Sequence, residues 1–144
     1  MSSVIGTHFL LDGYVKSDAV FTEKHILEVI DDIINVADMT YLGDPIVRDV
    51  PTDKNNIRRA EDDGGISILV PITTSHISAH CWPLRKLIML DIFSCKPFNA
   101  EVIERILKAS FNFSRYKTQF ISRRDPVATN DTQPIFPWNR IPSF

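Results

Sequence analysis

The sequence predicts an α+β fold: a two-layer sandwich in which helices pack on one face of an antiparallel β-sheet. Three observations favour this fold: six β-rich segments, two amphipathic helical segments, and an order with one helix early and one late. Runs of consecutive strands form antiparallel sheets with one face packed against helices. At 144 residues the chain fits one domain, which we predict over residues 1–124, followed by an extended tail over 125–144.

Two segments have the apolar spacing of amphipathic helices. From Glu23 to Asp38 apolar residues recur every three or four positions, and Thr22 stands where an N-cap accepts a backbone hydrogen bond. The second segment covers 100–111, follows Asn99 and has the same periodicity. Both helices therefore have one apolar face to bury against a sheet.

The β-rich segments are bounded by turn residues. Gly43 and Pro45 exclude a helix and leave a short edge strand within 41–50. The residues Pro83 to Lys86 suit a reversal of chain direction. A polar stretch over 52–65 predicts a long mobile loop, and four prolines predict the extended tail. The predicted strands cover residues 4–15, part of 41–50, 66–72, 75–82, 87–93 and 116–122.

Charge and composition exclude several classes of partner. The formal net charge of -2 gives no field that favours nucleic acid or an anionic membrane, so we expect a small-molecule partner or another copy of the chain. The start at Met1 lacks the pattern of a signal peptide, and no apolar run is long enough to span a membrane, which predicts a cytoplasmic protein. In that compartment Cys81 and Cys95 are expected as free thiols, with Cys81 used for packing.

The stretch from Ser75 to Pro83, followed by Asp91 to Cys95, concentrates hydroxyl, imidazole and thiol groups inside β-forming sequence. His76 and His80 have a metal-ligand spacing for a helix, but on a strand they lie about 13 Å apart, so no metal site is expected. His80 is either a reactive imidazole or a packed histidine with both nitrogens hydrogen bonded. The pattern therefore points to an organic active site.

The order and spacing of Ser67, Ser75, His80 and Cys95 resemble the prokaryotic S-adenosylmethionine decarboxylases, which cut their own chain before a serine. The resemblance implies cleavage between Thr74 and Ser75 and conversion of Ser75 into a pyruvoyl cofactor. It also implies that Ser67 and His80 assist this processing, and that Cys95 protonates the α-carbon after carbon dioxide leaves. The pyruvoyl carbonyl would form a Schiff base with the substrate amine and replace an external coenzyme.

The resemblance further implies a homodimer with the site near its interface, and a product used for spermidine synthesis. Strict strand alternation places Ser75 on the face opposite His80, so their cooperation requires a bulge or turn near Thr74. Without such a break in the strand, the catalytic interpretation fails.

Three positions depart from the family's pattern and leave alternatives open. Thr74 and Leu84 each stand where the family usually has glutamate, and Glu61 stands where it supplies an aromatic ring for adenine. One alternative is a decarboxylase for ornithine or arginine, whose cationic side chain would suit Glu61, Asp62 or Asp63. The other is an unprocessed, non-catalytic homologue that acts as a binding or regulatory protein.

Overall fold

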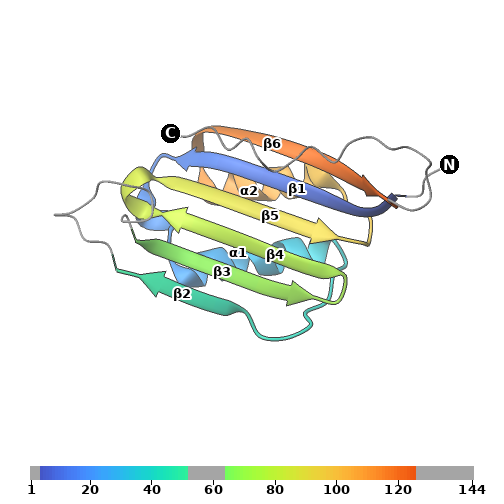
Figure 1. Cartoon of the computed structure of the whole chain (residues 1–144). Coiled ribbons are helices and arrows are strands. Elements are labelled where there is room, and N and C mark those ends of the chain that lie inside the picture. Colours follow the sequence, from blue (N-terminus) through green and yellow to red (C-terminus); the bar gives the residue numbers. More distant parts are fainter. Residues whose placement is uncertain (1–3, 52–63, 126–144) are drawn as a thin grey trace, which may run out of the picture.

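The computed structural model describes residues 4–51 and 64–125, which form one six-stranded sheet with two helices on one side (Figure 1). The strand order is β2-β3-β4-β5-β1-β6, and every neighbouring pair is antiparallel. This confirms the predicted α+β two-layer sandwich. The strands are β1 (Val4–Val15), β2 (Ile46–Val50), β3 (Gly65–Ile72), β4 (Ser75–Trp82), β5 (Leu87–Ser94) and β6 (Phe113–Arg124).

Both predicted helices are present, with the expected caps. Helix α1 covers Glu23–Val36, and the Thr22 hydroxyl accepts a hydrogen bond from the backbone N–H of His25 at 3.1 Å. Helix α2 covers Ala100–Phe111, where the Asn99 side chain accepts from the first-turn N–H groups. The prediction for α1 ran two residues too far, because Asp38 adopts a φ of 52° and cannot continue the helix.

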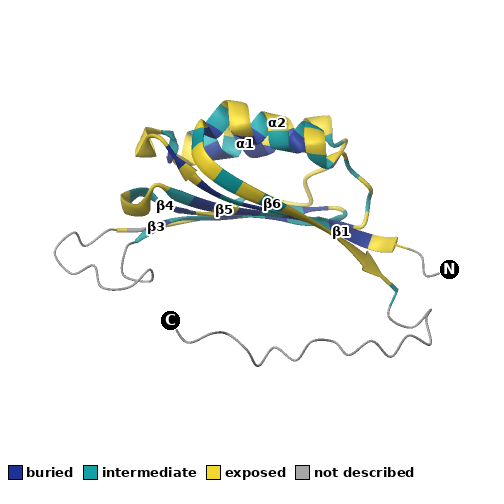
Figure 2. Ribbon diagram, turned by 90° about the horizontal axis from the view of Figure 1, so that it is seen from above, coloured by how far each residue is buried: buried dark blue, intermediate teal, exposed yellow. Residues whose placement is uncertain are grey.

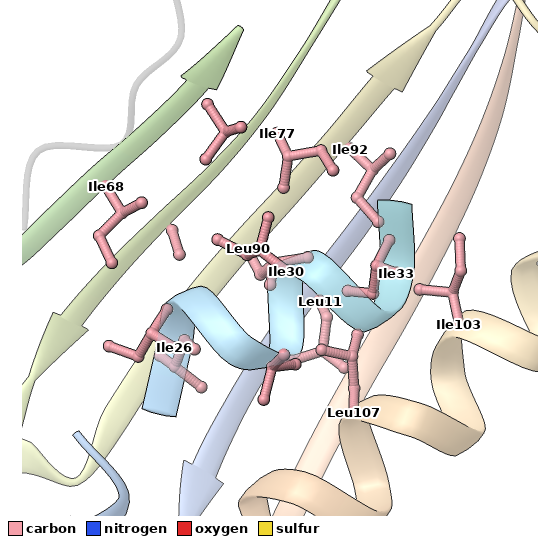
Figure 3. Close-up of a cluster of buried hydrophobic side chains, with 14 of the residues drawn as sticks. Leu11, Ile26, Ile30, Ile33, Ile68, Ile77, Leu90, Ile92, Ile103 and Leu107 are labelled. Carbon is pink, nitrogen blue, oxygen red and sulfur yellow. The ribbon is translucent and has the colours of Figure 1, made fainter. Parts of the chain in front are cut away.

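The core lies between the sheet and the helices. Figure 2 shows α1 and α2 together on one side of the sheet, and Figure 3 shows the side chains that meet there. The apolar faces of the helices contribute Ile26, Ile30, Ile33, Ile103 and Leu107, all at most 1% exposed. Facing them, alternate residues of the strands are equally buried, for example Leu11, Ile68, Ile77, Leu90 and Ile92. We call this side of the sheet the helix face.

The opposite side of the sheet, which we call the open face, is covered by none of the described helices (Figure 2). Residues directly opposite one another in neighbouring strands share a face, so the pairing register assigns each side chain. On the open face, His8, Phe93 and His76 form one row across β1, β5 and β4. Asp91 and Ser78 form the next row, and His80 and Ser67 lie in the row after that.

The last predicted strand differs most from the structure at its ends. The predicted strand at 116–122 is longer, because β6 pairs with β1 over most of its length from Phe113 to Arg124. Its polar, exposed residues carry little apolar alternation, so the sequence underestimates its length. The short edge strand predicted within 41–50 is present as β2 and begins directly after Pro45. The predicted loop over 52–65, apart from its last two residues, and the tail beyond Asp125 lie outside the described residues.

The chain reverses between β3 and β4 at a two-residue turn, Thr73-Thr74. Between β4 and β5 it reverses through a short 3-10 helix, Pro83–Arg85, followed by Lys86 with a φ of 53°, as the sequence predicts. None of the helices in the described part of the chain is long and apolar enough to cross a membrane.

The packing of α1 predicts a large cost for truncating Ile30, which is completely buried. In a chain that carries Ser75→Ala, which would block the self-cleavage expected from the sequence, Ile30→Ala should lower the free energy of unfolding by about 2–5 kcal/mol. The matched control is Val36→Ala at the exposed end of α1, where the side chain is 54% exposed and the change should be within about 0.5 kcal/mol. Urea unfolding measures both; equal effects would contradict this assignment of the core.

Candidate active site

The bond that the resemblance marks for cleavage lies at the β3–β4 turn. Ser75, the first residue of β4, has a φ of 147°, a conformation that L residues rarely adopt. The other described non-glycine residues with positive φ have values between 48° and 53°, in the ordinary left-handed region. A conformation as unusual as that of Ser75 costs of the order of 1–3 kcal/mol and persists only where the surroundings hold it.

A backbone hydrogen bond connects this turn to the end of β5. The carbonyl oxygen of Thr74, which belongs to the bond before Ser75, accepts from the backbone N–H of Cys95 at 3.0 Å. Next to it, Ser75 pairs with Ser94 across β4 and β5. The structure therefore brings two of the four predicted site residues, Ser75 and Cys95, together at one end of the sheet.

The Ser94 side chain supports the same turn from inside the protein. It is fully buried, and its hydroxyl donates to the Thr74 hydroxyl at 2.8 Å while it accepts from the Lys96 backbone N–H at 3.0 Å. Sequence reasoning missed this residue. The sequence did contain a sign of its importance. Ser94 continues the alternation of Ile88, Leu90 and Ile92, so a polar side chain stands at a position expected to be buried.

The other two predicted residues form a second pair on the open face. The Ser67 hydroxyl lies 3.0 Å from Nδ1 of His80, at hydrogen-bonding distance. In the single chain His80 is exposed and is not packed in the core. The pair borders a shallow cavity of about 270 Å³ that is also lined by Arg48 and Ser78. An imidazole with a hydroxyl beside it can move a proton to or from a group placed over this cavity.

Within one chain these two pairs do not meet. A turn at Thr73-Thr74 directly precedes Ser75, whose φ is positive, while Ser75 itself pairs in regular register with Ser94. His80 follows Ser75 by five residues in an extended strand, which separates them by about 17 Å. The four predicted residues thus form two half-sites: Ser75 with Cys95 at the end of the sheet, and Ser67 with His80 on the open face.

Side chains between the half-sites form a polar and aromatic row. The Phe93 ring contacts His8 on one side and His76 on the other, each with ring centroids 5.8 Å apart, and Arg123 lies 4.7 Å above it. His76 thus packs against the Phe93 ring. Nε2 of His8 is buried without a hydrogen bond and lies 3.6 Å from a carboxylate oxygen of Asp91.

Two further residues have clear structural surroundings. Cys81 is buried in the core, and this burial raises the pKa of its thiol to about 12, so it stays protonated and inert at neutral pH. Leu84 lies in the Pro83–Arg85 turn and is 40% exposed. Within residues 4–51 and 64–125, no three His, Cys, Asp or Glu side chains converge as a metal site would require.

Comparisons with known proteins identify the family. The sequence profile of the family described as S-adenosylmethionine decarboxylase matches residues 7–124, well over half of the chain. A protein named S-adenosylmethionine decarboxylase proenzyme from Archaeoglobus fulgidus is 26% identical over 93 residues, which are 64% of this chain and 72% of that protein. One of the same name from Hydrogenobaculum is 24% identical over 96 residues, 66% of this chain and 63% of that protein.

A solved structure agrees with the fold. The crystal structure of adenosylmethionine decarboxylase from Aquifex aeolicus superposes with a TM-score of 0.66, at 22% identity, and covers 85% of this chain and 92% of that one. At this identity the likeness supports the fold, while the profile match supports the family. The chain belongs to the S-adenosylmethionine decarboxylase family of carboxy-lyases.

Proposed function

We propose that this protein is a pyruvoyl-dependent S-adenosylmethionine decarboxylase that makes its cofactor by cutting its own chain between Thr74 and Ser75. One observation carries the proposal: the bond before Ser75 lies in a turn where Ser75 has a φ of 147° and the Thr74 carbonyl accepts from the Cys95 N–H at 3.0 Å. A strained backbone and a polarised carbonyl both favour attack on that carbonyl.

The self-cleavage needs only groups of the chain and water. The Ser75 hydroxyl oxygen attacks the Thr74 carbonyl carbon, the C–N bond breaks, and the hydroxyl proton passes to the released nitrogen, which leaves an ester. Loss of the Ser75 α-proton then breaks the bond between Cβ and oxygen, and frees Thr74 as a carboxylate. The remaining dehydroalanine becomes an imine, and water replaces its nitrogen, which leaves as ammonia. His80 and Ser67 are the groups we assign to these proton movements.

The fold tolerates a new chain end at residue 75. Cleavage there falls in the turn, so β3 and β4 each stay whole. The two products are interleaved in the sheet, because β4 pairs with β3 and β5 pairs with β1 across the cut. A pyruvoyl group at the start of β4 would therefore remain in place, next to Cys95. The residues present fit this cofactor.

The pyruvoyl carbonyl supplies the electron sink that decarboxylation of an amino acid requires and that no ordinary side chain provides. Cys95 is exposed and directly follows the strand that pairs with Ser75, so its thiol is the group we assign to protonating the substrate's α-carbon. S-adenosylmethionine is our leading substrate because the family match names it, and its decarboxylated product would serve spermidine synthesis. Both cysteines are free thiols, in keeping with the reducing cytoplasm that we propose as the location.

A homodimer would unite the two half-sites. Consider a twofold axis that runs parallel to the sheet and crosses its strands at the level of Ser78. The rotation exchanges the row of His76 with the row of His80, since each lies two residues from Ser78 along β4. With open faces packed about 10 Å apart, Ser67 and His80 of one chain would lie over the Ser75 end of the other.

The composition of the open face supports this packing. Large apolar side chains from five of the six strands are exposed on it, each between 36% and 47%. They are Tyr14, Ile46, Leu69, Met89 and Ile121. A second copy of the same sheet would bury them in a two-sheet core.

The positions at which this chain departs from the family's pattern affect which substrate it can bind. Leu84 is exposed and apolar where the family has a ribose-binding glutamate, so this chain must hold the ribose by other groups or accept a different amine. Glu61, Asp62 and Asp63, the residues that would suit ornithine or arginine, lie outside the described residues. S-adenosylmethionine, ornithine and arginine are therefore the three substrates to compare.

Self-cleavage is the first testable outcome. Purified wild-type protein should separate under denaturing conditions into residues 1–74 and 75–144, and the second fragment should carry the mass of a pyruvoyl group in place of serine. Ser75→Ala should remain one intact chain, because it lacks the attacking hydroxyl. Intact-mass spectrometry measures both. The cut protein should then release carbon dioxide from S-adenosylmethionine.

Three results would contradict the proposal in different ways. An uncut wild-type chain would favour the unprocessed homologue. Turnover of ornithine or arginine but not S-adenosylmethionine would keep the chemistry and replace the substrate. Cleavage at any other bond would remove Ser75 from its assigned role.

The shared site predicts complementation between inactive chains. Expressed alone, Ser75→Ala should stay uncut, and His80→Ala should be cut at least about a hundredfold more slowly than wild type. Co-expressed as mixed dimers, they form one intact site from Ser75 of the second variant and His80 of the first. The His80→Ala chain should then be cut while the Ser75→Ala chain stays whole. Mass spectrometry distinguishes the two chains; no cleavage in verified mixed dimers would show that both half-sites must belong to one chain.

A further inference from the structure

Ser94 is a buried polar residue to which the proposed chemistry assigns no role. It lies at the end of β5 on the helix face, fully buried, in a series otherwise made of Ile88, Leu90 and Ile92. Burying a hydroxyl is unfavourable unless it is hydrogen bonded, so an apolar residue would serve packing better. The contacts of Ser94 show what the hydroxyl holds in place.

The hydroxyl joins the two segments that meet at the cleavage bond. It donates to the Thr74 hydroxyl at 2.8 Å on one side and accepts from the Lys96 N–H at 3.0 Å on the other. Between these two contacts, the Cys95 N–H donates to the Thr74 carbonyl at 3.0 Å. Two hydrogen bonds thus tie Thr74 to the end of β5, one from Ser94 to its hydroxyl and one from Cys95 to the carbonyl to be attacked, while the Lys96 N–H holds the Ser94 hydroxyl.

We propose that Ser94 is a positioning residue for self-cleavage, which holds the Thr74 carbonyl against the Cys95 backbone amide so that this amide stabilises the oxyanion formed on attack. The inference rests on the proposed function. When the Ser75 oxygen adds to the carbonyl carbon, negative charge develops on the Thr74 oxygen, and a donor already aimed at that oxygen lowers the barrier. When the C–N bond breaks, the charge returns to the carbonyl bond.

The same contacts explain how threonine serves where the family usually has glutamate. The Thr74 hydroxyl reaches the buried Ser94 hydroxyl directly. A β-branched residue is also stiff at χ1, so this contact fixes the backbone that carries the carbonyl. In this chain a short hydroxyl contact inside the protein orients the scissile bond.

Ser94→Ala tests the inference through the rate of self-cleavage. Freshly translated chain should be cut about a hundredfold more slowly than wild type, the loss expected for misplacing a reacting group by about 1 Å. Ser94→Thr, which keeps a hydroxyl, should restore most of the rate. Thr74→Val removes the other hydroxyl and should slow cleavage too. Because both act through one hydrogen bond, the double variant Ser94→Ala with Thr74→Val should be no slower than Ser94→Ala alone.

Hydroxylamine identifies the step that Ser94 affects. This nucleophile cuts esters, so it rapidly cleaves any chain that has completed the acyl shift but cannot proceed. Hydroxylamine should not speed the slow cleavage of Ser94→Ala, because the slowed step precedes the ester. Rapid hydroxylamine cleavage of Ser94→Ala would place its effect after the attack and overturn the inference.

Two controls separate this role from a general loss of structure. Ser114→Ala removes another hydroxyl that is hydrogen bonded to backbone, on the far strand β6, and should cut at the wild-type rate. Urea unfolding of each variant in the Ser75→Ala chain shows whether the fold is kept. If Ser94→Ala does not fold, the Thr74→Val variant tests the inference instead. Slow cleavage of this variant supports the inference, and cleavage at the wild-type rate refutes it. An uncut wild-type chain would contradict the proposed function itself, whereas normal cleavage of all variants would contradict only the role of Ser94.

Discussion

The pairing register of β3, β4 and β5 is the constraint on which the rest of the site depends. It sets Ser75 beside Ser94 at one end of the sheet and Ser67 beside His80 on the open face, about 17 Å along the strand. A shift of one residue would move every side chain of a strand to the other face. The same register that buries Ile77 and Ile92 under the helices therefore also divides the reactive groups into two half-sites.

The two faces of the sheet carry different groups of residues. The helix face holds the core and, through Ser94, the turn that carries Ser75 in its unusual conformation. The open face carries the Ser67–His80 pair among apolar side chains that no described element covers. In the proposed dimer, a second copy of the chain would cover this face and bring the two half-sites together.

The sequence predicted the parts of the fold that depend on local periodicity. Helix α2 has the predicted bounds, and α1 ends two residues before its predicted end. Helices are predictable because apolar spacing and N-caps such as Thr22 and Asn99 depend only on residues close in sequence. The Ser67–His80 contact, the φ of Ser75 and the contacts of Ser94 were not predictable in that way. Each depends on which strands pair and in what register, and β6 was underestimated because polar residues pair through backbone alone.

An experimental structure of the uncut Ser75→Ala protein tests the central claim most directly. The account predicts a dimer in which open faces meet, with the imidazole of His80 from one chain within about 5 Å of the bond between residues 74 and 75 of the other, the reach of a proton transfer through one water. A dimer that leaves the open faces apart, or a lone chain with His80 about 17 Å from residue 75, would contradict it.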